Sequence, residues 1–275
     1  MTLLEQIKMC RLRKKEEIFV IAGLAKQARL ALQKEKTSRI EVRNGGRKYF
    51  ILKTSRGPEI YSRPIRYDLY IQDENELKLA TNEMAKGGNS KSLLNNITRA
   101  SYTFVQDIAA YLDIFESGGS KKTLGTFFES QISVLINMVT GLEAKSGSIK
   151  LPGLEEKVSW DLSVKGKTRP FLFVATKTST RERLSQPFVQ KLILSKALKK
   201  PIRAILVVIG DVQRVKKKQI QHTFTAGQFL LYSRFVERLD GVYYMDMPPQ
   251  ADKLAKDGLL MPFKNLLNDL PAFVL

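Results

Sequence analysis

Three residue types are nearly absent from this sequence: cysteine, histidine and tryptophan each occur once in 275 residues. The single cysteine, Cys10, excludes an internal disulfide, and such sparse cysteine is typical of proteins from a reducing, intracellular compartment. With one histidine, His222, the sequence also excludes a zinc site of the usual Cys/His kind and disfavours catalysis by a Cys/His pair. Any metal ion is therefore expected to be bound by oxygen.

Long apolar runs are absent as well. The longest strongly apolar stretch, Ala204–Ile209, is far too short to span a membrane. Residues 1–6 lack the basic and apolar regions of a signal peptide. We therefore expect no membrane among the partners of this chain.

Acidic residues are scarce relative to basic ones. The chain has 46 Lys and Arg against 27 Asp and Glu, which gives a net charge of +19 and a pI near 9.9. Such an excess disfavours compact folding through self-repulsion unless a polyanion screens it. A nucleic acid is therefore the expected partner, rather than a small-molecule substrate.

The N-terminal part predicts helices followed by a β-ribbon. Residues 3–36 carry apolar positions at helical spacing. Two alternating segments then flank Asn44-Gly45-Gly46, a strong hairpin signal, and a third extended run is predicted over residues 60–70. Basic residues are frequent along the ribbon: Arg39, Arg43, Arg47, Lys48, Lys53, Arg56, Arg63 and Arg66. The ribbon either contacts DNA in the major groove or is a solvated basic face of a sheet.

Two glycine-rich breaks then interrupt the chain. Residues 86–91 and 117–120 have loop composition, and a long helix is predicted between them over residues 92–116. From Leu124 onward the pattern is helix, three strands, helix and strand, which is typical of an α/β core. The sequence therefore predicts a DNA-engaging N-terminal region over residues 1–120 and a catalytic core over residues 121–275.

One carboxylate lies on the first helix predicted for this core, and another lies on a strand that follows it. The helix predicted over residues 124–142 buries one face, and Glu129 lies at the edge of that face. In the strand predicted over residues 158–164, Asp161 projects from the face opposite Val158, Trp160, Leu162 and Val164. An ionised acidic side chain at such a partly buried position is costly unless a charged group pairs with it.

The next strand supplies a cation. Residues 171–177 are apolar on both faces, as in a central, covered strand, and the run ends at Lys177. A lysine at the end of a buried strand is costly unless an anion neutralises it. Asp161, on the neighbouring strand, is the expected partner of Lys177.

The order of these residues resembles the active site of the PD-(D/E)xK nucleases. Asp161 is followed, at a spacing of sixteen residues, by a lysine that ends a hydrophobic strand. Directly after Lys177, the run Thr178-Ser179-Thr180-Arg181-Glu182-Arg183 is similar to a run in type II restriction endonucleases whose target sites contain CC:GG dinucleotides. The resemblance covers about residues 124–210. It implies an α/β fold with a central mixed sheet flanked by helices. The N-terminal helix and β-ribbon, which the resemblance does not cover, are predicted as an extension of this core.

The resemblance also assigns roles. Arg181 and Arg183 would donate to guanine, and Glu182 would accept from cytosine. Ser179 and Gln186 complete the predicted DNA-binding set. The predicted catalytic residues are Asp161, Lys177 and Glu129, of which Asp161 and Glu129 are the predicted ligands of Mg²⁺.

The sequence departs from the family motif at one position. Ala175 stands where most members have an acidic residue two positions before the lysine. A single carboxylate binds Mg²⁺ poorly, because this ion prefers several oxygen ligands in octahedral geometry. Three explanations stay open. Glu129 replaces the missing acid, Gln190 on the following helix ligates weakly, or Ala175 is itself an inactivating substitution.

The function implied is site-specific hydrolysis of double-stranded DNA with Mg²⁺, by a homodimeric restriction enzyme of the prokaryotic cytoplasm. Symmetric sites favour symmetric dimers, and the exposed-looking apolar residues 271–275 are a candidate subunit contact. A structure-specific repair or recombination nuclease is one alternative. A DNA-binding protein with an inactive nuclease core is the other, and the absence of an acid at Ala175 favours it.

Overall fold

The computed structural model describes residues 1–274 apart from 56–58, 88–89, 117–120, 167–170, 182, 200–201 and 217–218. Glu182, Arg56 and the predicted boundary loop at 117–120 therefore lie outside the described residues. The chain forms two compact units, which are described separately below. Unit 1 comprises Met1–Gln131 and Val212–His222, and unit 2 comprises Ile132–Asp211 and Thr223–Leu275. Helix α5 (Lys121–Thr140) contributes residues to both units.

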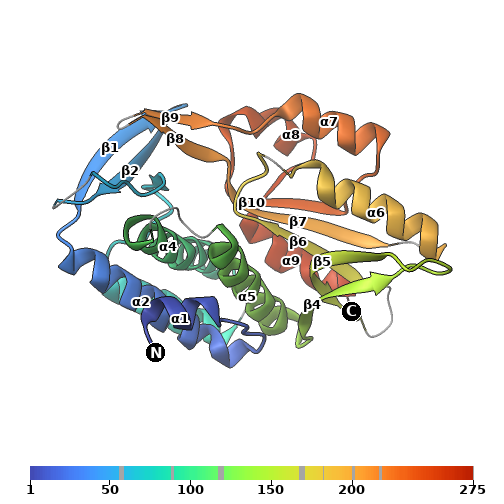
Figure 1. Ribbon diagram of the computed structural model, residues 1–275, viewed down its shortest axis with the longest axis horizontal. Helices are drawn as coiled ribbons and strands as arrows, with labels where there is room; N and C mark the ends of the chain where they lie inside the picture. Colours follow the sequence, from blue (N-terminus) through green and yellow to red (C-terminus); the bar gives the residue numbers. More distant parts are fainter. Residues whose placement is uncertain are drawn as a thin grey trace. The chain divides into compact units, whose positions relative to one another are not determined.

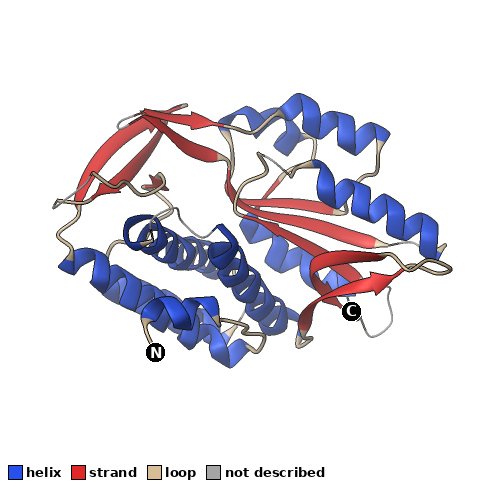
Figure 2. Cartoon of the chain, in the orientation of Figure 1, coloured by secondary structure: helices blue, strands red, loops and turns tan. Residues whose placement is uncertain are grey.

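Unit 1 combines a group of helices with short antiparallel strands (Figures 1 and 2). Its helices are α1 (Leu3–Lys8), η1 (Lys15–Glu17), α2 (Ile18–Lys34), α3 (Glu74–Lys86), α4 (Lys91–Phe115) and the first part of α5. Its strands are β1 (Ser38–Asn44), β2 (Arg47–Lys53), β3 (Ile65–Arg66), β8 (Val212–Lys216) and β9 (Gln219–His222). The predicted helices over residues 3–36 and 92–116 are confirmed, whereas α3 was not predicted.

The helices of unit 1 begin at residues that cap them. Asp73 accepts the amide of Glu76 at 2.7 Å and so starts α3, and Ser90 accepts the amide of Leu93 at 3.2 Å at the start of α4. A side-chain acceptor at this position satisfies an amide that has no partner within the helix.

The predicted hairpin is confirmed, but the third strand is mostly wrong. β1 pairs with β2 through the Gly45-Gly46 turn, in which both glycines have positive φ, 58° and 75°. A two-residue turn of this kind matches the twist of the two strands. The run predicted over residues 60–70 forms only the two-residue β3 and one bridge from Tyr61 to Lys53. Pro64 precedes β3, and proline cannot donate to a strand ladder.

A hairpin distant in sequence completes the ribbon of unit 1. β8 and β9 pair with each other, and Ile220 of β9 packs with Val42, Tyr49 and Ile51. The side-chain amide of Asn44 also donates to the backbone carbonyl of Ile220 at 2.7 Å. One face of the β1–β2 ribbon is therefore covered by the β8–β9 hairpin.

A buried ion pair fixes the helices of unit 1. Arg29 of α2 contacts the carboxylate of Asp107 of α4 at 2.9 Å, and the hydroxyl of Tyr70 donates to the other oxygen of the same carboxylate. Arg29 also donates to the carbonyl of Ile71 at 3.1 Å. Burial raises the pKa of Asp107 to about 6. Burial opposes the charge of Arg29, but Asp107, Tyr70 and Glu74 together outweigh it and raise the pKa of the guanidinium.

Unit 2 is built around a six-stranded mixed sheet in the order β11-β10-β7-β6-β5-β4 (Figure 1). Its strands are β4 (Ala144–Lys150), β5 (Lys157–Val164), β6 (Leu172–Lys177), β7 (Arg203–Gly210), β10 (Gly241–Asp246) and β11 (Met261–Pro262). Its helices are α6 (Ser185–Leu198), α7 (Ala226–Phe235), η2 (Pro249–Ala251), α8 (Asp252–Lys256), α9 (Phe263–Val274) and the last part of α5. The predicted order of helix, three strands, helix and strand is confirmed.

Helices cover both faces of this sheet. Phe188 of α6 and Phe229 of α7 pack in one cluster with Phe173, Leu206 and Tyr244 of the sheet. Tyr243, the neighbour of Tyr244 in β10, donates its hydroxyl to Asp269 of α9 at 2.8 Å. Because successive residues of a strand point to opposite faces, α9 lies on the face opposite α6 and α7. β6 is therefore a central, covered strand, as its apolar sequence predicts.

The C-terminal prediction is wrong. The apolar residues after Leu270 continue α9, and both Phe273 and Val274 are buried within unit 2. The guanidinium of Arg203 stacks on the ring of Phe273 at 5.7 Å. Phe273 and Val274 complete the core of their own unit, so neither side chain is available to a second subunit. Within the described residues, no helix has the length and apolar character needed to cross a bilayer.

Candidate functional site

The predicted pair of Asp161 and Lys177 is present at the end of β6. The Lys177 ammonium lies 2.7 Å from Oδ2 of Asp161, and the same oxygen accepts the backbone amide of Thr176 at 2.8 Å. The β5–β6 ladder ends at the pair Leu162–Val174. Asp161 stands one residue beyond that pair, where the two strands stop pairing, and its carboxylate takes up an amide that β5 no longer engages. Oδ1 of Asp161 has no hydrogen-bond partner among the described residues.

Unit 2 contains a second Lys–Asp pair of nearly the same construction. Lys191 of α6 lies 2.8 Å from Oδ2 of Asp240, which also accepts the backbone amide of Ala204 at 2.8 Å. The lysine and aspartate side chains are 10% and 24% exposed in this pair, against 14% and 25% in the pair of Lys177 and Asp161. Contact geometry and burial alone therefore do not distinguish the two.

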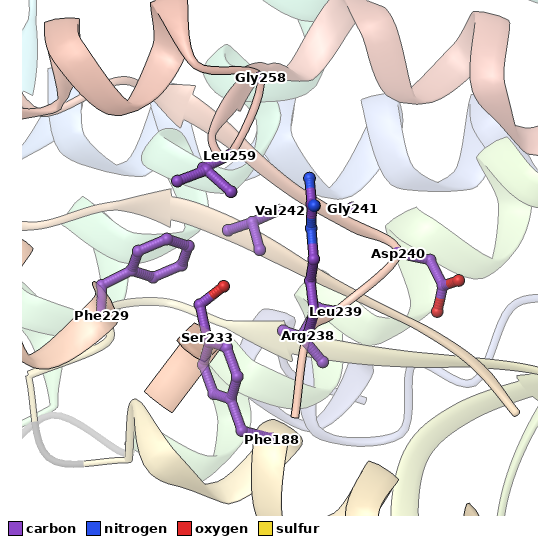
Figure 3. Close-up of a pocket in the computed structure, with 10 residues that line it drawn as sticks. All are labelled: Phe188, Phe229, Ser233, Arg238, Leu239, Asp240, Gly241, Val242, Gly258 and Leu259. Atoms are coloured by element: carbon purple, nitrogen blue, oxygen red, sulfur yellow. The ribbon is translucent and has the colours of Figure 1, made fainter. Parts of the chain in front are cut away.

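Their positions in the sheet do distinguish them. Lys177 ends β6, which runs parallel to β7, and ligands of open α/β sheets bind beyond the carboxyl ends of the strands. Asp240 precedes β10 and, with Arg238 and Gly241, lines a small pocket shown in Figure 3. Neither Asp161 nor Lys177 lines that pocket. The pair of Asp161 and Lys177 is therefore the candidate site. The pair of Lys191 and Asp240 connects α6 to the segment before β10 and is interpreted as a structural contact.

The donor set around Asp161 is small. Ala175, one residue beyond the end of the ladder on β6, is buried and supplies no oxygen from its side chain. The described residues contain no cluster of three or more acidic, histidine or cysteine side chains. Mg²⁺ is often held by only one or two carboxylates, with water and substrate phosphate as the remaining ligands. Asp161 supplies one such carboxylate beside Lys177.

Two other residues were predicted as replacements for the missing acid. The side-chain amide of Gln190 on α6 donates to the carbonyl of Ser159 at 2.6 Å. Ser159 lies two residues before Asp161 on β5, so α6 brings Gln190 beside the strand that carries the carboxylate. Glu129 lies on α5, half-buried, within unit 1. Both remain predicted ligands.

The loop after Lys177 carries the predicted base-contacting residues. Arg181 and Arg183 are both exposed, and the guanidinium of Arg183 has no partner among the described residues. The hydroxyl of Ser179 donates to Asp211 at 2.8 Å, so in this conformation it serves an internal contact. The side-chain oxygen of Gln186 is buried and accepts no hydrogen bond from a described residue.

Asp211 is the main residue of this region that was not predicted. It follows β7, is fully buried, and its carboxylate accepts four hydrogen bonds. The donors are the hydroxyl of Ser179 (2.8 Å), the amide and hydroxyl of Thr180 (2.7 and 2.6 Å) and the hydroxyl of Tyr244 (2.8 Å). Burial, and then the charge of Asp211, raise the pKa of Tyr244 well above its usual value, so this phenol stays protonated. An aspartate directly after a buried parallel strand was the available signal.

The basic residues of the β-ribbon are largely engaged within unit 1. Lys48 pairs with Glu41 at 3.1 Å, Lys53 with Glu59 at 2.5 Å, Arg63 with Asp113 at 2.8 Å and Arg66 with Asp68 at 2.7 Å. Arg39 stacks on Phe50 at 4.8 Å. Arg43 is exposed and has no partner among the described residues. Contact between this ribbon and DNA stays a prediction, and Arg43 is the residue best placed to make it.

The fold is that of type II restriction endonucleases. The crystal structure of the Type IIP restriction endonuclease Kpn2I is similar over 98% of this chain and 97% of that chain, with a TM-score of 0.80 and 22% sequence identity. The restriction endonuclease PspGI in its complex with substrate DNA is a weaker match, with a TM-score of 0.44 and 13% identity over 72% of this chain and 91% of that one. No protein-family model and no curated protein sequence matches the chain.

The predicted fold class is thereby confirmed: an α/β chain with a central mixed sheet flanked by helices. At 22% identity the likeness extends to the fold and does not carry over the roles of individual residues. Those roles depend on the chemistry of the site itself.

Proposed function

We propose that this protein is a site-specific DNA endonuclease of the type II restriction class, which hydrolyses phosphodiester bonds with Mg²⁺. The observation that carries the proposal is the ion pair of Asp161 and Lys177 at the carboxyl end of β6, in a chain with the fold of Kpn2I. The net charge of +19 supports a polyanionic substrate. The target is proposed to contain GG/CC, and the working form is proposed to be a homodimer.

The proposed roles follow from charge and position. Asp161, together with Glu129 or Gln190, would hold Mg²⁺, which when bound polarises a phosphate and makes a bound water more acidic. Lys177 would leave its ion pair with Asp161 to donate to the phosphate, where negative charge increases in the transition state. No side chain of the site is required to form a covalent bond to the substrate.

Recognition of the target is assigned to the loop after Lys177. The guanidinium groups of Arg181 and Arg183 would donate to guanine, and Glu182 would accept from cytosine. The exposure of both arginines supports this assignment. Glu182 lies outside the described residues, and its role rests on the sequence resemblance.

Cleavage of phage DNA tests the proposal. The protein is incubated with Mg²⁺ and phage DNA, and the ends of the products are sequenced. We expect discrete fragments that share one short sequence at their ends. Smeared products or cutting of branched DNA alone would overturn site-specific cleavage.

A matched pair of variants tests the assignment of the site. Lys177→Ala is expected to lower the cleavage rate by at least about 10²- to 10³-fold, as for the loss of one preorganised donor in an active site, and to leave DNA binding intact. Lys191→Ala removes a lysine from the second Lys–Asp pair, at 2.8 Å and with similar burial. We expect this control to lose stability and to keep the specific activity of the folded protein. Equal losses of cleavage in both variants would remove Lys177 from the mechanism.

Ala175 supports a second candidate, a DNA-binding protein with an inactive nuclease core. The position is buried and supplies no oxygen, so the site has fewer metal ligands than the family motif implies. The candidate predicts sequence-specific binding without cutting at any concentration of Mg²⁺ or Mn²⁺. An Ala175→Asp variant that gains cleavage would favour it, whereas cleavage by the unmodified chain would exclude it.

A further inference from the structure

The loop that carries Arg181 and Arg183 is held to the sheet by one buried carboxylate. Asp211 accepts three hydrogen bonds from this loop, one from Ser179 and two from Thr180. The fourth comes from Tyr244 on β10. The backbone carbonyl of Asp211 also accepts the amide of Thr223 at 2.8 Å. The residue therefore joins the loop, the end of β7, β10 and the start of the segment that leads to α7.

The electrostatics of this carboxylate are unusual for a residue that only supports a core. Among the described residues no cation contacts Asp211, and its four partners are neutral hydroxyls and an amide. A buried carboxylate without a cation loses much of its hydration and depends on these donors. The two loop residues that supply the donors directly precede Arg181. By binding Ser179 and Thr180, Asp211 holds in place the backbone that leads into the exposed arginines.

The backbone amides of the two arginines are bonded within the same segment. The amide of Arg181 bonds the hydroxyl of Ser179 at 3.3 Å, and the amide of Arg183 bonds the carbonyl of Thr180 at 3.3 Å. Both contacts are internal to the loop, and both depend on residues that Asp211 holds. A bidentate contact between arginine and guanine needs a defined origin for the side chain, because both donors must meet their acceptors at once.

We infer that Asp211 is a positioning residue for sequence recognition, which fixes Ser179 and Thr180 so that Arg181 and Arg183 reach base edges in one register. The inference rests on the proposed function, since it assigns how the same site recognises its DNA. Asp211 itself contacts no substrate. Its loss is expected to weaken discrimination between target and near-target sequences more than it weakens overall DNA binding.

Two isosteric variants separate this role from a purely structural one. Oδ2 of Asp211 accepts the hydroxyl of Thr180 on the loop side at 2.6 Å and the hydroxyl of Tyr244 on the core side at 2.8 Å. Thr180→Val removes the first bond and Tyr244→Phe the second. Each change deletes one hydrogen bond from a neutral hydroxyl to the same carboxylate oxygen, for which we expect a similar fall in melting temperature. Thr180→Ser keeps the hydroxyl and is the rescue variant.

The measurement is the ratio of DNA affinities for the target and for single-base variants of it, with EDTA present so that nothing is cut. The target sequence comes from the ends of the cleavage products or, if the wild type does not cut, from fragments that it selects from a random library. We expect Thr180→Val to lower the affinity ratio about tenfold, within the range that one bidentate base contact contributes. Tyr244→Phe and Thr180→Ser should keep the wild-type ratio.

Hydrogen exchange gives a second readout that needs no DNA. The amides of Arg181 and Arg183 should exchange faster in Thr180→Val than in Tyr244→Phe at equal global stability. If Thr180→Val does not fold, Thr180→Ala, which removes the same hydroxyl, replaces it in both measurements.

The outcomes distinguish the two proposals. A wild type that neither cuts at a defined sequence nor binds one preferentially would overturn both the proposed function and this inference. A wild type that discriminates, with a Thr180→Val variant that discriminates equally well, would overturn the inference alone. Equal loss of discrimination in Thr180→Val and Tyr244→Phe would also overturn it, because the carboxylate would then act through the stability of the fold.

Discussion

Two buried aspartates, one in each unit, are stabilised in different ways. Asp107 of unit 1 is balanced by the guanidinium of Arg29 and by the hydroxyl of Tyr70. Asp211 of unit 2 is surrounded by neutral donors, most of them from one loop. The first connects α2, α4 and the segment at Tyr70 and Ile71, all parts of a scaffold. The second holds a short exposed loop. The two carboxylates are similarly buried, but Asp107 stabilises the packing of helices and Asp211 stabilises the position of a loop.

The largest effect is expected from removal of the charge-balanced carboxylate. Asp107→Ala leaves the guanidinium of Arg29 buried against the ring of Tyr70, with backbone carbonyls as its remaining hydrogen-bond partners. We expect the free energy of unfolding to fall by about 3–5 kcal/mol. Urea denaturation followed by circular dichroism measures this change. Glu41→Ala breaks the exposed pair with Lys48 and is the control, with an expected loss below about 1 kcal/mol. Equal losses would contradict the distinction between the two kinds of pair.

A pH titration sharpens the same comparison. Burial raises the pKa of Asp107 from 3.8 to about 6 in the folded protein. A raised pKa means that the folded state binds the proton more tightly than the unfolded state. This contribution to stability is therefore complete below pH 4 and is lost as the pH rises through about 6.

Asp107→Asn cannot bind this proton and provides the reference. Relative to the Asn variant, the wild type should lose up to about 3 kcal/mol of unfolding free energy between pH 4 and pH 7. Hydrogen exchange of the amides in α2 and α4 localises the effect to unit 1. A constant difference over this pH range would show that Asp107 has the same pKa in both states.

The smallest effect is expected on the side of unit 2, at the arginine that the loop presents. Arg183→Ala should cost about 1–3 kcal/mol of binding free energy at one base pair of the target. Lys145→Ala, on the exposed face of β4, removes the same charge without a predicted base contact. It should leave discrimination unchanged. A loss in Arg183→Ala that is uniform across unrelated sequences would identify a phosphate contact instead.

Local patterns were sufficient to predict much of the sheet and of the candidate site. The turn at Asn44-Gly45-Gly46 depends on residues that tolerate positive φ, and these three adjacent residues are sufficient to predict it. The pairing of Asp161 with Lys177 followed from a charge at the end of an apolar strand, because an opposite charge offsets much of the cost of burying the lysine there.

The wrong prediction for the C-terminal residues and the omission of Asp211 have a common cause, because both depend on packing between residues distant in sequence. The C-terminal residues Phe273 and Val274 are apolar in sequence whether they fill their own core or a partner's, and only the tertiary structure distinguishes these cases. The four contacts of Asp211 join residues separated by about 30 positions. No periodicity in the sequence marks such a site.

The β8–β9 hairpin has a consequence for the order in which the protein is assembled during translation. The chain leaves unit 2 after Asp211, forms the hairpin of unit 1, and resumes unit 2 at Thr223. Ile220 fills the cluster that contains Val42, Tyr49 and Ile51. Domains commonly fold in N- to C-terminal order as they emerge from the ribosome. In this protein one apolar face of the nascent β1–β2 ribbon stays exposed to solvent until more than 200 residues have been synthesised. In a fragment that ends near residue 120, which lacks the β8–β9 hairpin, the same face would remain exposed.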